Sequence, residues 1–219
     1  MLSDLHRSLP VGAPIHLRFG KGDLDRLTAV DLMTGAGFGG VAVVEADDHH
    51  DVDAVRLHSL PDMVGAGMKL VVCGLNPSLH AADAGVGYAG PSNRFWSVIA
   101  EVVGLTDRDP ADLLANHGIG MTDLVKRATR AASEISGAEF ETGLARVDRL
   151  VAWLQPAAVC FVGLGGWRAA GHGRAQPGWQ AETVGGRPAY VMPSTSGRNA
   201  QTSRGALAGH LRQALRTQP

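Results

Sequence analysis

The chain has 219 residues, of which 45% are hydrophobic and 19% charged, and this suits a globular protein with one core and a small additional layer. No apolar run is long enough to cross a membrane, and the first residues lack the basic and apolar segments of a signal peptide. We therefore expect a soluble, cytoplasmic protein of bacterial type with no membrane partner. The two cysteines lie in apolar runs, which predicts reduced core thiols, and they are too few to hold an iron–sulfur cluster.

The formal net charge of −1 does not by itself indicate a nucleic-acid partner, but the charges are unevenly distributed. Residues 1–60 carry five basic and nine acidic side chains, whereas residues 61–219 carry fifteen and twelve. From Arg168 onward there are seven arginines and a single acid, Glu182. DNA binding requires only a local cationic face, although a charge run of this kind is more often a solvated surface.

The first residues predict a short α/β segment. The pattern indicates strands at Ile15–Phe19 and Gly39–Val44 around a helix near Leu27–Thr34, which a glycine-rich stretch ends. His49–Asp51 could suggest a metal site, but the neighbouring acids favour a solvated turn, and we expect no metal. We interpret residues 1–65 as an α/β addition of unknown role.

Residues 66–219 alternate buried strands with helices and form the main predicted domain. We expect strands at Lys69–Gly74, Ala157–Gly163 and Pro188–Met192. Helices are expected at Asn93–Val103, after the capping box at Ser136 and before Pro156, and near the C-terminus, where Leu207, Leu211 and Leu215 share one face. This order predicts an α/β fold, a three-layer sandwich whose central, mostly parallel sheet is flanked by helices.

Two loops that follow predicted strands carry the candidate chemistry. Asn76 follows the strand that ends at Gly74, and Arg198 stands among small residues in the loop Met192–Gln201. Sites on parallel sheets lie at the carboxyl ends of the strands, so the two side chains should share one cleft. An amide can orient a water molecule, and an arginine on a loop of small residues can enter a base stack.

Five stretches, in this order, resemble the motifs of the mismatch-specific uracil/thymine-DNA glycosylase family of the uracil-DNA glycosylase superfamily: Gly74–Ser78, Gly87–Trp96, Gly118–Thr129, Leu154–Gly163 and Met192–Arg198. The resemblance implies a uracil-DNA glycosylase-like fold and a monofunctional enzyme that excises uracil opposite guanine from double-stranded DNA. Thymine and other damaged pyrimidines are further substrates to consider. The resemblance also implies a monomer that needs no cofactor and leaves an abasic site.

The resemblance assigns roles residue by residue. Asn76 and Thr129 match the catalytic residues that hold the water, and Arg198 matches the side chain that replaces the extruded nucleotide. The implied substrate-binding residues are Gly74, Leu75, Ser78, Tyr88, Asn93 and Asp123, and the implied DNA-binding residues are Lys126, Ser194, Ser196, Gly197, Arg198 and Asn199.

Three positions depart from the family pattern. Ser78 stands where glycine is common, and Asp123 stands where asparagine or lysine is common. Gly87 replaces a bulkier residue and leaves space near the methyl position of the base. Two alternatives therefore stay open, a catalytically weak or inactive DNA-damage-binding protein on the same fold and a ligand-binding α/β domain unrelated to DNA.

Overall fold

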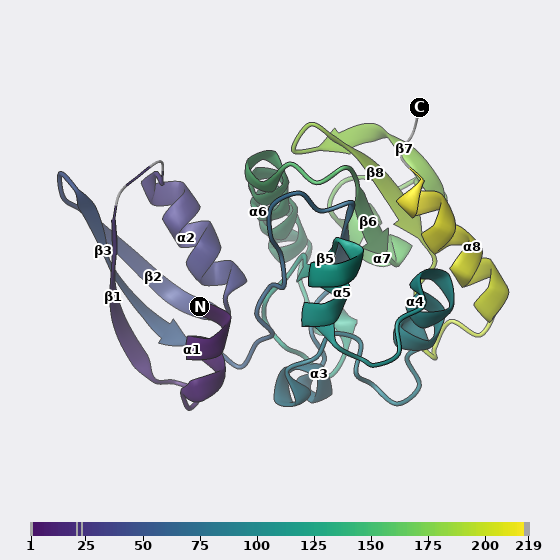
Figure 1. The fold of residues 1–219 in the computed structure, drawn as a ribbon, viewed down its shortest axis with the longest axis horizontal. Helices are drawn as coiled ribbons and strands as arrows, with labels where there is room; N and C mark the ends of the chain where they lie inside the picture. The colour runs from purple at the N-terminus through teal and green to yellow at the C-terminus, as the bar shows by residue number, and fades with distance from the viewer. Residues whose placement is uncertain (1, 21, 23, 217–219) are drawn as a thin grey trace.

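The computed structural model describes residues 2–20, 22 and 24–216, and within them the chain forms two separate β-sheets with their own helices (Figure 1). The larger sheet has the order β5-β4-β6-β8-β7. Four of its strands are parallel, and β7 is an antiparallel edge. Its strands are β4 (Leu70–Gly74), β5 (Ile119–Asp123), β6 (Val159–Val162), β7 (Gly178–Val184) and β8 (Arg187–Met192).

Helices cover both faces of this sheet, so the predicted three-layer α/β sandwich is confirmed. Alternate residues of β4 face opposite ways: Leu70 and Val72 join one apolar cluster, and Val71 and Cys73 join the other. The first face is covered by α4 (Phe95–Val103), α5 (Pro110–His117) and α8 (Arg204–Leu215), and the second by α6 (Gly137–Leu154) and α7 (Leu164–Ala169). A short helix, α3 (Leu79–Ala84), follows β4.

Residues 2–56, which we call the N-terminal unit, form the smaller sheet with the antiparallel order β1-β3-β2. The unit consists of α1 (Leu2–Ser8), β1 (Pro14–Gly20), α2 (Arg26–Gly35), β2 (Phe38–Glu45) and β3 (His49–Arg56). Its apolar residues form a cluster of their own. The expected strand–helix–strand order is confirmed at β1, α2 and β2, while α1 and β3 were not predicted.

The interpretation of His49–Asp51 as a solvated turn is wrong, because these residues begin β3. Within β3 the buried residues alternate with more exposed ones, and the side chains of His50, Val52 and Ala54 are buried. The His50 ring bonds to the Leu24 carbonyl at 2.8 Å. Asp51 and Asp53 lie on the outer face and alternate with the buried residues, but the buried polar His50 and the exposed apolar Val55 interrupt this period-two pattern in the sequence.

The N-terminal unit packs against the three-layer body through α2 and α6 (Figure 1). Arg149 of α6 binds the Asp31 carboxylate of α2 with distances of 2.6 and 2.9 Å. Within the described residues, no group of His, Cys, Asp or Glu side chains is arranged to hold a metal ion. None of the described helices is both long enough and apolar enough to span a membrane.

Candidate active-site cleft

A cleft of about 580 Å³ opens at the carboxyl edge of the parallel strands. Its walls come from the loops that follow β4, β5 and β8, together with the segment that precedes α4. The cleft is lined by most of the residues that the sequence singles out: Leu75, Asn76, Ser78, Tyr88, Asn93, Asp123, Thr129, Ser194, Ser196, Arg198 and Asn199. Asn76 and Arg198 therefore share one cleft.

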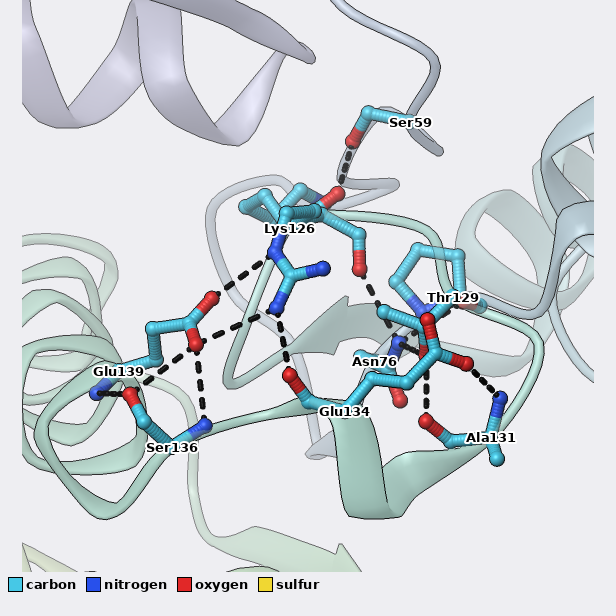
Figure 2. Close-up of polar contacts among 10 residues, drawn as sticks. Ser59, Asn76, Lys126, Thr129, Ala131, Glu134, Ser136 and Glu139 are labelled. Carbon is cyan, nitrogen blue, oxygen red and sulfur yellow. Dashed lines mark hydrogen bonds and ion pairs between the residues drawn. The ribbon is translucent and has the colours of Figure 1, made fainter.

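The side-chain amide of Asn76 is held in a single orientation (Figure 2). Its nitrogen donates to the Pro77 carbonyl and the Arg127 carbonyl, both at 3.0 Å, and to the Thr129 hydroxyl at 2.8 Å. These acceptors require the NH₂ group on their side, which places Oδ1 on the other side of the amide plane. Among the described residues, Oδ1 has no hydrogen-bond donor, so it is available to a molecule in the cleft.

The hydroxyl of Thr129, which lines the cleft, is engaged by two hydrogen bonds. Its hydroxyl donates to the Ala131 carbonyl at 3.0 Å while it accepts from Asn76, as Figure 2 shows. Its backbone nitrogen donates to the Pro77 carbonyl at 3.1 Å, and Ser78 pairs with Thr129 as an isolated parallel bridge. The side chain is buried, with 4% exposure. The Thr129 side chain is therefore fixed in place and holds the Asn76 amide.

The remaining residues of the first motif build the loop. Ser78 caps α3 by accepting from the Ala81 nitrogen at 3.1 Å, so serine at this position has a local structural reason. Gly74 does not line the cleft, but any side chain there would collide with the Asp123 carboxylate and crowd the Tyr88 hydroxyl. Leu75 lines the cleft beside Asn76.

An aromatic group lies on the opposite wall. Tyr88 stacks on Phe95 of α4, with ring centroids 4.3 Å apart and an angle of 20° between the planes. Burial raises the pKa of the Tyr88 hydroxyl well above its usual value, and no described residue bonds to that oxygen. The Trp96 indole donates to the Gly87 carbonyl at 2.7 Å and fixes the segment. Asn93 lines the cleft, and its side-chain oxygen accepts from the Phe95 nitrogen at 3.0 Å.

Asp123 brings a carboxyl group into the cleft at the end of β5. Burial raises its pKa from 3.8 to about 6, and nearby Asp62 adds to this rise while Lys126 and Arg146 oppose it. Arg146 donates to the Asp123 backbone carbonyl at 2.9 Å, but the carboxylate oxygens have no hydrogen-bond partner among the described residues. The cleft thus contains an acid that changes its charge close to neutral pH.

The burial of Lys126 contradicts the DNA-binding role that the resemblance implies for it. Its ammonium group is buried and binds the Asp62 carboxylate at 2.6 Å, and Arg146 binds the other oxygen of the same carboxylate at 2.8 Å. Burial disfavours the Asp62 anion, but Arg146 and Lys126 outweigh it and lower its pKa. The exposed cation that this loop offers to the cleft is Arg130.

The loop that carries Arg198 is braced from within and by Arg94, the residue before α4. Asn199 donates to the Ser194 carbonyl at 2.7 Å and to the Thr202 hydroxyl at 3.1 Å, so its amide holds the loop. Arg94 donates to the Asn199 and Thr202 carbonyls, both at 2.6 Å. The Arg198 side chain itself is exposed.

Small side chains keep the same loop compact. The Ser194 and Ser196 hydroxyls accept from backbone nitrogens two residues further along the loop, at 3.2 and 3.4 Å. Gly197 does not line the cleft, but a side chain there would approach the Ser92 side chain and backbone within 2.6 to 2.9 Å. The loop therefore needs small residues where the sequence has them.

Sequence reasoning missed several residues that shape the site. They include Leu60 and Arg130, which line the cleft, Asp62, which holds Lys126 and Arg146, and Arg94, which braces the Arg198 loop. Arg94 lies inside the stretch Gly87–Trp96 that carries the resemblance, so its position in this motif could have identified it as a site residue. Leu60 and Asp62 lie in an unremarkable stretch between the two sheets and carry no local signal.

The chain is similar to a solution NMR structure from Methanosarcina acetivorans, which is described provisionally as a uracil DNA glycosylase, with 20% identity and a TM-score of 0.48. That similarity covers 70% of this chain and 95% of the other. The model of the uracil DNA glycosylase superfamily matches residues 61–217, which include every residue singled out by sequence in the cleft. The chain therefore belongs to the uracil DNA glycosylase superfamily.

Proposed function

We propose that the protein is a monofunctional DNA glycosylase that excises uracil mispaired with guanine from double-stranded DNA and leaves an abasic site. Thymine and other damaged pyrimidines opposite guanine are further candidate substrates. The observation that carries the proposal is the orientation of Asn76, whose amide nitrogen is held by three acceptors while its oxygen is left for a ligand. Superfamily membership favours this function over a ligand-binding domain unrelated to DNA.

The reaction breaks the bond between the base and the sugar, so the sugar becomes cationic as the base leaves as an anion. A water molecule must then reach the sugar in the correct geometry. Oδ1 of Asn76 can accept a hydrogen bond from that water, but an amide is too weak a base to deprotonate it. Its contribution is orientation, and Thr129 supports it by holding the amide nitrogen.

The buried end of the cleft is suited to an extruded base. Phe95 covers one face of the Tyr88 ring, which supports a role for Tyr88 as a stacking surface. The Asp123 carboxyl can accept from the N3–H of uracil when it is ionised and donate to a base carbonyl when it is protonated. Both groups lie in the same cleft as Asn76.

The mouth of the cleft carries the cations that DNA requires. Arg198 and Arg130 are exposed and line the cleft, and Arg168 lies beside the base of the Arg198 loop. We assign Arg198 the position left by the extruded nucleotide and Arg130 a phosphate contact. No lysine lines the cleft in the described part of the chain, so nothing there suggests a Schiff base with the sugar.

Single-turnover excision of uracil from a G·U duplex tests the proposal. Asn76→Ala should bind the duplex as the wild type does but excise uracil about tenfold to a thousandfold more slowly, because the water loses its orienting partner. Asn116→Ala is the matched control, since Asn116 is an exposed asparagine on α5. Strand cleavage should require alkali after base release. Equal rates for Asn76→Ala and wild type would remove Asn76 from the mechanism.

The second candidate function is a DNA-damage-binding protein with little or no turnover. It is favoured by the Asp123 carboxyl, because an ionised acid in the cleft would repel a departing base anion. Tight binding of a G·U duplex by the wild-type protein, without release of uracil, would establish this alternative.

A further inference from the structure

We infer that Leu60, on the segment that joins the N-terminal unit to the three-layer body, limits the size of the base that the cleft accepts. The inference rests on the proposed glycosylase function and adds a specificity-determining residue to it. Leu60 lies just outside the stretch that matches the superfamily, so none of the five motifs supplies this wall.

Leu60 separates the cleft from a second, much smaller cavity of about 20 Å³. The two spaces share four lining residues: Leu60, Gly87, Tyr88 and Asp123. The other residues that line the smaller cavity include Arg7 of α1 and Met121 of β5. With only 8% of its surface exposed, Leu60 fills the partition between the two spaces.

This partition lies at the end of the cleft where a base would be enclosed. Arg130 and Arg198 line the exposed mouth, whereas Leu60 and Asp123 are buried. A base that leaves the duplex sheds water as it enters an enclosed pocket with few polar groups. The apolar Leu60 side chain and the polar Asp123 carboxyl together form such a surface.

Gly87 shows how closely Leu60 approaches this wall. A Cβ atom at Gly87 would lie 3.4 Å from Cδ2 of Leu60 and 3.0 Å from Cε of Met121. The sequence predicts that Gly87 leaves space near the methyl position of the base. In the folded protein Leu60 and Met121 border that space, so the absence of a side chain at Gly87 does not alone make the pocket large.

Residues on both sides of Leu60 in the chain form hydrogen bonds and ion pairs with the three-layer body. The Ser59 hydroxyl donates to the Lys126 carbonyl at 2.5 Å. The Asp62 carboxylate accepts from the Thr122 hydroxyl at 2.7 Å and binds Lys126 and Arg146. Leu60 therefore cannot move away from the cleft without the loss of buried polar contacts.

The N-terminal unit holds the same segment from the other side. The Asp62 nitrogen donates to the Gly35 carbonyl at 2.8 Å, and the Leu57 nitrogen donates to the Gly37 carbonyl at 3.0 Å. The His6 ring lies 3.1 Å from the Leu57 carbonyl. The addition at the N-terminus thus acquires a role, because it fixes the segment that forms one wall of the cleft.

The test compares bases of different size, each opposite guanine, in the full-length protein. Leu60→Ala removes the methyl groups of the partition and joins the two spaces. For each variant, the single-turnover efficiency on thymine and on 3,N4-ethenocytosine is divided by the efficiency on uracil. In Leu60→Ala this ratio should rise about tenfold or more over the wild-type ratio, since one methylene in a pocket typically changes discrimination 10- to 200-fold. Because each ratio is compared with the wild-type ratio for the same base, differences in how readily the bases leave cancel.

Three further variants make the result specific. Leu60→Met preserves the side-chain volume and should keep the wild-type ratios, whereas Leu60→Val should give an intermediate change with less risk to folding. Leu57→Ala removes an exposed leucine from the same segment and should leave the ratios unchanged.

Unchanged ratios in a folded Leu60→Ala or Leu60→Val protein that still excises uracil would overturn this inference and leave the proposed function intact. An equal shift in Leu57→Ala would also overturn it, because the effect would then belong to the segment as a whole. A wild-type protein that releases no base would overturn the proposed function, and this inference with it.

Discussion

Replacing Asp123 with asparagine should stabilise the protein above pH 6 and have little effect near pH 4. Burial raises the pKa of this carboxyl from 3.8 to about 6, Asp62 adds to the rise, and Lys126 and Arg146 oppose it. Between these two pH values the folded protein keeps a proton that the unfolded chain has lost. Ionisation therefore favours unfolding, and the free energy of unfolding falls as the pH rises through this range.

The size of the effect follows from the two pKa values. A rise from 3.8 to about 6 corresponds to a loss of up to about 3 kcal/mol in unfolding free energy once the pH exceeds 6. Asparagine has nearly the same shape as aspartate and carries no charge, so Asp123→Asn should recover most of this loss. For a protein of this length the recovery corresponds to roughly 6–12 °C in Tm.

Urea unfolding of wild type and Asp123→Asn at about pH 4 and about pH 8 measures the effect, which a pH series between them should trace to about pH 6. Asp47→Asn is the control, because Asp47 is exposed between β2 and β3 and has no hydrogen bond or ion pair with the described residues. An Asp123→Asn protein that is less stable than wild type at pH 8 would refute the reasoning. The same stability difference at both pH values would also refute it.

Further predictions concern the two loops and the buried ion network. Arg198→Ala should slow excision more on A·U than on G·U duplexes and least on single-stranded DNA, because a well-paired nucleotide is harder to extrude; equal losses on all three substrates would leave only a phosphate contact. Thr129→Val should slow excision without weakening duplex binding, since Asn76 loses the hydroxyl that orients it, and rescue by Thr129→Ser in the same assay would show that the hydroxyl is responsible. Asp62→Ala should lower the unfolding free energy by about 3–5 kcal/mol in urea titrations, because Lys126 and Arg146 are left buried without their carboxylate, and a loss under 1 kcal/mol would contradict this.

Much of the architecture was predictable from local patterns. The strand β4 is apolar on both faces, and the capping box of Ser136 and Glu139 starts α6 as expected. Such signals depend on residues within a few positions of one another, so the sequence alone specifies them. The strands β5 and β7 were not recognised: β5 has a glycine in its interior and ends on the polar residues Thr122 and Asp123, and β7 is an edge strand with weak alternation of burial.

The sequence also placed Asn76 and Arg198 after strands, and the carboxyl edge of a parallel sheet brings such loops together. It did not predict what each side chain contacts. Lys126 has the sequence context of an exposed cation, but its partner Asp62 lies 64 residues earlier in the chain. Thr129 bonds to the side-chain amide of Asn76, 53 residues away, and nothing near Thr129 in the sequence reveals this contact.

The sequence by itself determined the class of fold, the caps and turns, and the loops on which chemistry is possible, because each of these depends on short-range periodicity and backbone preference. Only the tertiary structure decided the charge state of Asp123, the burial of Lys126 and the contribution of Leu60 to the cleft. These properties depend on desolvation and on contacts between segments far apart in the chain.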